Sequence, residues 1–137
     1  MSDGVYDLAL YLHLARASEV RRQMLVRDRL LVIVASLAEA ERLPLIAACC
    51  RHKVLQHNPG HLLRHWPTVS EAAEDNLFTT FLKQMWRRYP REKAEQMLAA
   101  LGLDMARERE TYYSDFEYAA SLLGTTPDEL TEQFATS

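Results

Sequence analysis

The sequence predicts an all-α protein: a single compact bundle-like domain, residues 1–137, of about six or seven helices around a central apolar helix at about 19–42. Apolar residues recur at helical spacing along most of the chain. Nine of the eleven residues from Leu30 to Ala40 are apolar, which is typical of a helix buried nearly all round. Only four Gly and five Pro leave little material for the many turns of a strand-rich sandwich.

The first two helices follow from this apolar spacing. The first is expected from about Val5 to Ala17, and the second from about Glu19 to Arg42. The second should have a basic and exposed start, made by four arginines: Arg21, Arg22, Arg27 and Arg29. The run Val32 to Val34 could seed a strand, but the Leu and Ala residues on both sides favour a helix.

Proline marks the boundaries of the next elements. Pro44 suits the first turn of a third helix, which should run from Leu45 to about His57 and stop at Asn58-Pro59-Gly60. A short helical turn from His61 to Trp66 is expected next, because Pro67 closes it.

The segment before Pro90 has the clearest amphipathic pattern in the chain. Thr68 and Glu71 have the spacing of a capping box. Seven apolar residues follow at helical spacing: Leu77, Phe78, Phe81, Leu82, Met85, Trp86 and Tyr89. Pro90 should end this helix and start another, which Gly102 caps in the left-handed conformation.

Two further helices are expected near the C-terminus. One runs from about Asp104 to Leu123, with Tyr113 on its apolar side and Gly124 as its cap, and the last begins at Thr126. The segment 118–130 has the form of a helix-turn-helix, but acidic residues at the start of its second helix would repel phosphates. We therefore expect an αα-corner there rather than a DNA-reading motif.

Cysteine usage and the chain start predict a soluble cytoplasmic protein. Cys49 and Cys50 are adjacent, so a disulfide between them would be strained, and free thiols are typical of a reducing compartment. The N-terminal residues lack the order of a signal peptide, and no apolar stretch is long enough to span a bilayer. The formal net charge is −3.

Four of the five histidines fall within fourteen residues, and this His52–His65 cluster is the most distinctive local feature. His61 and His65 are four residues apart, so on a helix their imidazoles share a face and could chelate a divalent metal, zinc or iron. His57 could close on them as a third ligand. Such a metal is the one cofactor that the residues suggest.

The same cluster has a second interpretation, in which the histidines cap and pack a helix end. No Asp or Glu lies between Glu41 and Glu71, so a metal site or proton relay would need an acid from a distant helix.

A second alternative is a binder of nucleic acid or of a phosphorylated ligand through a basic patch. Cations gather at 51–64 and 83–93, close in sequence to Trp66, Trp86 and Tyr89. The net acidity argues against a general nucleic-acid binder, and the rings of Trp86 and Tyr89 lie on the apolar stripe, where they should be core.

The interpretation that the sequence favours is a small binding or interaction module, adaptor or regulatory, rather than an enzyme. Cys49 and His52 lack the third group that would orient a catalytic base, and no phosphate loop, Ser-centred elbow or Cys-x-x-Cys motif is present. A protein partner or self-association is expected. The predicted binding surface is the rim of the bend at Asn58 and has seven residues: Arg51, Lys53, His57, Asn58, His61, Arg64 and His65.

Overall fold

The computed structural model describes residues 2–135, and within this range every regular element is a helix. This confirms the predicted all-α class. In chain order the elements are α1 Asp3–Val20, α2 Met24–Ala40, α3 Pro44–His57, the 3₁₀ turn η1 Leu62–His65, α4 Val69–Ala72, α5 Asn76–Arg88, α6 Arg91–Leu101, α7 Met105–Arg109, α8 Asp115–Leu122 and α9 Pro127–Phe134.

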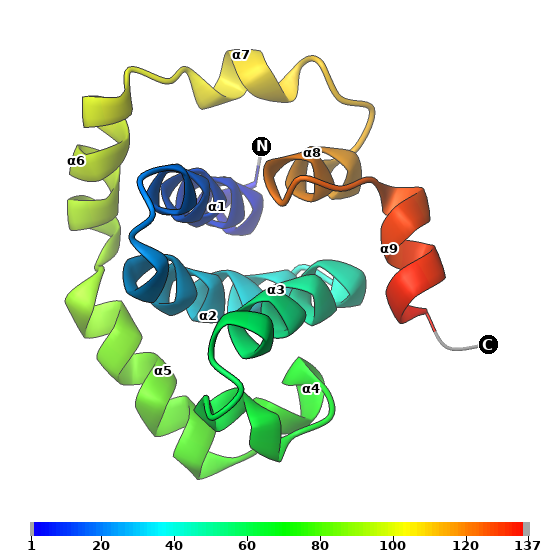
Figure 1. Cartoon of the computed structure of the whole chain (residues 1–137). Helices are drawn as coiled ribbons and strands as arrows, with labels where there is room; N and C mark the ends of the chain where they lie inside the picture. Colours follow the sequence, from blue (N-terminus) through cyan, green and yellow to red (C-terminus); the bar gives the residue numbers. More distant parts are fainter. Residues whose placement is uncertain (1, 136–137) are drawn as a thin grey trace.

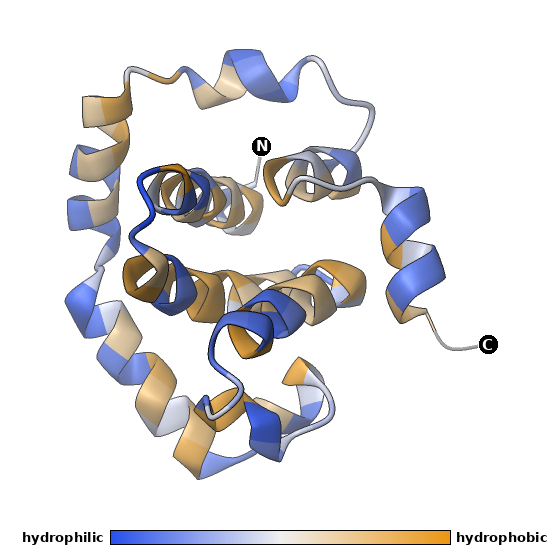
Figure 2. Ribbon diagram, viewed as in Figure 1, coloured by the Kyte–Doolittle hydropathy of each residue, from blue (hydrophilic) through white to orange (hydrophobic). Residues whose placement is uncertain are grey.

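Helix α2 lies at the centre of the molecule. It packs against α1 on one side and α3 on the other, and α4 and α5 also contact it. The later helices run round the edge of this α1–α2–α3 layer, with α6 and α8 against α1, and α9 against α3 (Figure 1). Leu30 to Ala35 are at most 2% exposed, and the central helices carry much of the apolar colour in Figure 2. The central apolar helix is therefore confirmed, and Val32 to Val34 are helical.

The apolar stripe of α5 contributes to one hydrophobic core shared with α1 and α2. The Tyr11 hydroxyl donates to the carbonyl oxygen of Tyr89 at 2.7 Å, and the Tyr11 ring meets Trp86 edge to face at a centroid distance of 5.2 Å. Tyr89 is 6% exposed. Tyr89 is therefore a core residue, as the pattern of the stripe predicts, and Trp86 is partly buried against the core.

The boundary between the first two helices differs from the prediction. Helix α1 continues to Val20, and α2 begins at Met24 rather than near Glu19. Arg22 makes the turn with a φ of +59°, and the Gln23 N–H donates to the Ser18 carbonyl at 2.8 Å. The exposed arginine face is also only partly correct, because Arg27 is 6% exposed.

The helix predicted from Asp104 to Leu123 is two helices, α7 and α8, joined by a turn. Ser114 caps α8, since its hydroxyl accepts from the Glu117 N–H at 3.0 Å. Tyr113 is 97% exposed in this turn, so its predicted place on the apolar side is wrong. The turn is held by Arg109, whose Nε donates to Asp115 Oδ1 at 2.8 Å.

The predicted caps are otherwise found where expected. Thr68 accepts from the Glu71 N–H at 3.1 Å, although the helix that it starts, α4, has only four residues and Asp75 caps α5 separately. Gly102 and Gly124 have φ values of +68° and +77°. Helices α8 and α9 form the expected corner. Among residues 2–135, no helix has the length and apolar character needed to cross a bilayer.

Candidate functional site

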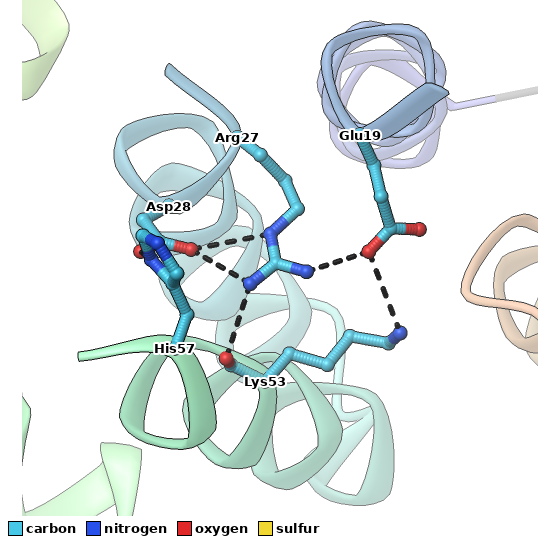
Figure 3. A network of polar contacts seen from close by, with 5 residues as sticks. All are labelled: Glu19, Arg27, Asp28, Lys53 and His57. Carbon is cyan, nitrogen blue, oxygen red and sulfur yellow. Dashed lines mark hydrogen bonds and ion pairs between the residues drawn. The ribbon is translucent and has the colours of Figure 1, made fainter. Parts of the chain in front are cut away.

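The start of α2 holds a buried network of charges that joins three helices (Figure 3). The side chains of Arg27 and Asp28 are 7% and 5% exposed, and Arg27 donates from Nε and Nη2 to Asp28 Oδ1 at 3.2 and 2.9 Å. Arg27 also donates to Glu19 Oε1 of α1 at 2.5 Å and to the Lys53 carbonyl of α3 at 3.1 Å. The guanidinium is thus hydrogen-bonded on every side, as a buried charge requires.

The second oxygen of Asp28 fixes the orientation of His57. Asp28 Oδ2 lies 2.5 Å from His57 Nδ1 (Figure 3). A carboxylate can only accept, so the proton of the neutral imidazole is on Nδ1 and Nε2 is left for another partner. The His57 side chain is 40% exposed, so a ligand can reach it.

His61 is held in the opposite tautomer. Its Nδ1 accepts from the Leu63 N–H at 3.1 Å, which places the proton of the neutral ring on Nε2. Its ring packs edge to face on Phe81 at a centroid distance of 5.5 Å. Burial lowers the pKa of His61, although the charge of Asp28 opposes this shift. Neutral His61 therefore offers an N–H donor.

Both histidines line a pocket of about 560 Å³ between the start of α2, the end of α3 and one face of α5. Its wall combines cationic, hydrogen-bonding and apolar side chains. The lining residues are Leu25, Asp28, Arg29, His57, Asn58, Gly60, His61, Leu62, Phe81, Met85 and Arg88. We call this the α3-end pocket.

Of the predicted binding surface, His57, Asn58 and His61 line the α3-end pocket. The other four residues do not. Arg64 donates to the Gly60 carbonyl, and the His65 ring lies 5.9 Å from that of Trp66.

The two cations of α3 also serve other contacts. Arg51 Nε donates to the Trp66 carbonyl at 2.9 Å, and Lys53 Nζ lies 3.9 Å from Glu19. His52, the first histidine of the cluster, packs on Phe134 at a centroid distance of 5.6 Å and lines a different pocket. The predicted rim is thus divided: three of its residues line the α3-end pocket, and the other four lie outside it.

The three histidines suggested as metal ligands, His57, His61 and His65, are not assembled into a metal site. Within residues 2–135, no three His, Cys, Asp or Glu side chains form a group that could hold a metal ion. Asp28 of α2 supplies a carboxylate from a distant helix, as a metal site would need. Its Oδ1 accepts from Arg27 and its Oδ2 lies against His57, so neither oxygen is left for a metal.

The aromatic rings near the basic segments do not form a stacking platform. Trp66 is 8% exposed, and its Nε1 donates to Asp75 Oδ2 at 3.2 Å. The thiols are no better placed for chemistry, because burial raises the pKa values of Cys49 and Cys50. The α3-end pocket is the candidate site because it brings together three of the seven predicted binding residues.

The residues that sequence reasoning missed come from α2 and α5. They are Leu25, Asp28, Arg29, Phe81 and Met85, whereas Arg88 belongs to the basic segment 83–93 of the alternative with a phosphorylated ligand. Phe81 and Met85 were recognised as part of an apolar stripe, but nothing in the stripe shows that they face a pocket. The useful signal for Asp28 is weak: it is the one acid in the basic segment 20–38.

No family model, no curated protein and no solved structure matches this chain.

Proposed function

We propose that this protein acts by binding a small organic molecule in the α3-end pocket. The observation that carries the proposal is that His57 and His61, from the predicted rim, line a pocket of about 560 Å³. This volume lies in the range of sites that enclose small molecules. A pocket of this kind favours a small ligand over the protein partner or self-association that the sequence alone suggests.

Binding is favoured over catalysis by the composition of the pocket wall. Asp28 and His57 form a carboxylate–imidazole pair, but no hydroxyl or thiol side chain is among the residues that line the pocket. Such a pair activates a nucleophile only when one stands beside it. In this pocket it serves to hold the His57 ring in one orientation.

We also propose the cytoplasm as the compartment in which the protein works. Cys49 and Cys50 are free and buried in α3, which supports a reducing environment.

The proposal is tested by nuclear magnetic resonance titration of the full chain with three probes of equal length: octanoate, 1-octanol and octylamine. At least one probe should shift the amide signals of Leu25, Asn58 and Leu62 in a saturable manner. Absence of a saturable shift with all three probes would overturn the proposal. A dimer in light scattering whose interface protects these amides would do so too, because the pocket would then be a subunit contact.

A matched pair of variants locates the binding. Leu25 and Leu77 are 60% and 58% exposed, but only Leu25 lines the α3-end pocket. Leu25→Trp should fill part of the pocket and weaken binding of the active probe, whereas Leu77→Trp should leave it unchanged. Equal effects of the two variants would place the probe elsewhere.

A further inference from the structure

We infer that the ligand of the α3-end pocket is a small organic anion, a carboxylate or phosphate group on an apolar body. This inference rests on the proposed function, since it names the chemical class that the same pocket accepts. It follows from the charges and hydrogen-bonding groups of the wall, taken together with its apolar side.

Two guanidinium groups supply uncompensated positive charge to the pocket. Arg29 lies on α2 and Arg88 on α5, so they approach from different helices. No ion pair within residues 2–135 involves either of them. Guanidinium forks match the geometry of carboxylate and phosphate oxygens, which makes an anion the natural partner.

The one carboxylate in the wall does not cancel this charge. Asp28 accepts from Arg27 through Oδ1 and faces His57 through Oδ2, so both oxygens are used inside the protein. A cationic ligand would therefore meet two arginines and find no free acid. The expected selectivity is against cations as well as in favour of anions.

The hydrogen-bonding group of His61 suits the same ligand. His61 presents Nε2–H as a donor, because its Nδ1 already accepts from Leu63. His57 leaves Nε2 as an acceptor, which suits a hydroxyl on the body of the ligand or a water molecule. An anionic head has acceptor oxygens for the Nε2–H of His61 and for the two arginines.

The apolar side of the pocket indicates that the anion is organic. Leu25, Leu62, Phe81 and Met85 line the wall beside the cations. An inorganic ion would leave these side chains in contact with water, whereas an alkyl or aryl group would bury them.

The helix ends near the pocket oppose one another in their effect on an anion. The C-terminus of α3 at His57 is the negative end of its dipole and disfavours an anion. Helix α2 begins at Met24 with no side-chain cap, so its positive end lies one residue from Leu25 of the wall. Such partial charges are each about half an elementary charge, so the two arginines decide the balance.

The same three probes test the class of ligand. Octanoate should bind about tenfold more tightly than 1-octanol, as expected for charged hydrogen bonds to arginine, and octylamine should bind weakest. If 1-octanol or octylamine binds as tightly as octanoate, this inference is overturned while the proposed function stands. If no probe binds, the proposed function itself fails.

A double variant shows whether the arginines are responsible. Arg29→Gln with Arg88→Gln should lower the octanoate affinity about tenfold and leave the 1-octanol affinity unchanged, which also shows that the pocket is intact. Arg87→Gln is the matched control, because Arg87 precedes Arg88 on α5 and does not line the pocket. An equal loss in the control would contradict the assignment.

Vesicles distinguish a dissolved anion from a lipid headgroup. The protein should not sediment with phosphatidylglycerol vesicles at the salt concentration that permits octanoate binding. Sedimentation with these vesicles together with the absence of octanoate shifts in the pocket would overturn the inference, because the recognised anion would then be a membrane surface.

Discussion

At the scale of residues, the ion pair of Arg27 and Asp28 holds one wall of the pocket in place, because it joins α2 to α1, α3 and His57. Removing two charges from water costs free energy that their attraction repays only when every donor and acceptor is used. Here the guanidinium bonds to α1 and α3 as well as to Asp28, and the carboxylate also bonds to His57. The pair therefore contributes orientation more than net stability.

Loss of the Asp28 charge should be strongly destabilising. Asp28→Asn leaves the buried Arg27 without its carboxylate, and we expect the free energy of unfolding to fall by about 3 kcal/mol. Urea denaturation measures this change. Glu19→Gln is the control: the Glu19 side chain is 43% exposed, so its loss should cost less than about 1 kcal/mol. Equal costs would show that the buried pair is not the main contact of Arg27.

His13 should make the protein less stable in mild acid. Its Nε2 lies 2.6 Å from the Tyr118 hydroxyl, and burial lowers the pKa of His13 below its ordinary value of 6.5, against the opposing charge of Glu108. As the pH falls below 6.5, the unfolded chain takes up this proton before the folded protein does. The contribution of neutral His13 to the free energy of unfolding should therefore be complete above pH 6.5 and decrease below it.

The measurement is urea denaturation at about pH 7.5 and about pH 5.5, on either side of the ordinary histidine pKa, for the natural protein and His13→Gln. The variant should lose less stability between the two pH values, because all other groups titrate alike in both proteins. His61, whose pKa is also lowered by burial, remains in each. An unchanged pH dependence in His13→Gln would contradict the assignment to His13.

Part of the candidate site could be predicted from the sequence at this scale. His57, Asn58 and His61 flank a Pro-Gly bend, so their place at a helix end follows from local rules. Asp28 lies 29 residues from His57, and only the packing of α2 on α3 brings them together. In the sequence Arg27 resembles the neighbouring exposed arginines, because the residues around it do not show whether a charged side chain is buried.

At the scale of elements, helix ends were predictable where glycine makes the turn. Gly102 and Gly124 have positive φ values, as expected for left-handed caps. Arg22 and Arg42 make the same kind of turn after α1 and α2. Because neither turn has a glycine, the boundary between α1 and α2 is absent from the pattern of residue types.

Gly124→Ala should cost about 1 kcal/mol, because an alanine side chain strains the left-handed conformation. No other atom lies within 4 Å of the added Cβ, so the cost is backbone strain alone. Gly60→Ala is the matched control. Gly60 is exposed, has no positive φ, and its added Cβ meets only Asn58 Oδ1 at 3.6 Å.

Thermal or urea unfolding measures both variants, and the control should change stability by less than about 0.5 kcal/mol. A cost for Gly60→Ala equal to that for Gly124→Ala would show that the left-handed turn before α9 is not the source of the effect.

At the scale of the whole molecule, the central place of α2 could be predicted because nine of the eleven residues from Leu30 to Ala40 are apolar, which leaves almost no polar face. The path of the later helices could not. Each of α5, α6, α8 and α9 buries one face, and a one-faced helix fits several positions round the α1–α2–α3 layer. The split between α7 and α8 has a local signal, because Ser114 and Glu117 have capping-box spacing, but apolar residues at helical spacing continue across it and favour one long helix.

The central place of α2 predicts that its amides exchange only when the whole protein unfolds, whereas those of the short helix α7 exchange by local opening. Ile33 of α2 is 0% exposed, and Ile33→Ala should lower the free energy of unfolding by about 3 kcal/mol. Amides 30–35 should exchange with solvent only on global unfolding, so their protection should fall by the same amount. Helix α7 has five residues, and the Glu108 amide, bonded to the Asp104 carbonyl at 3.1 Å, should exchange by local opening that the variant leaves unchanged. Hydrogen exchange followed by nuclear magnetic resonance measures both, and an equal fall at Glu108 would show instead that α7 unfolds only together with the core.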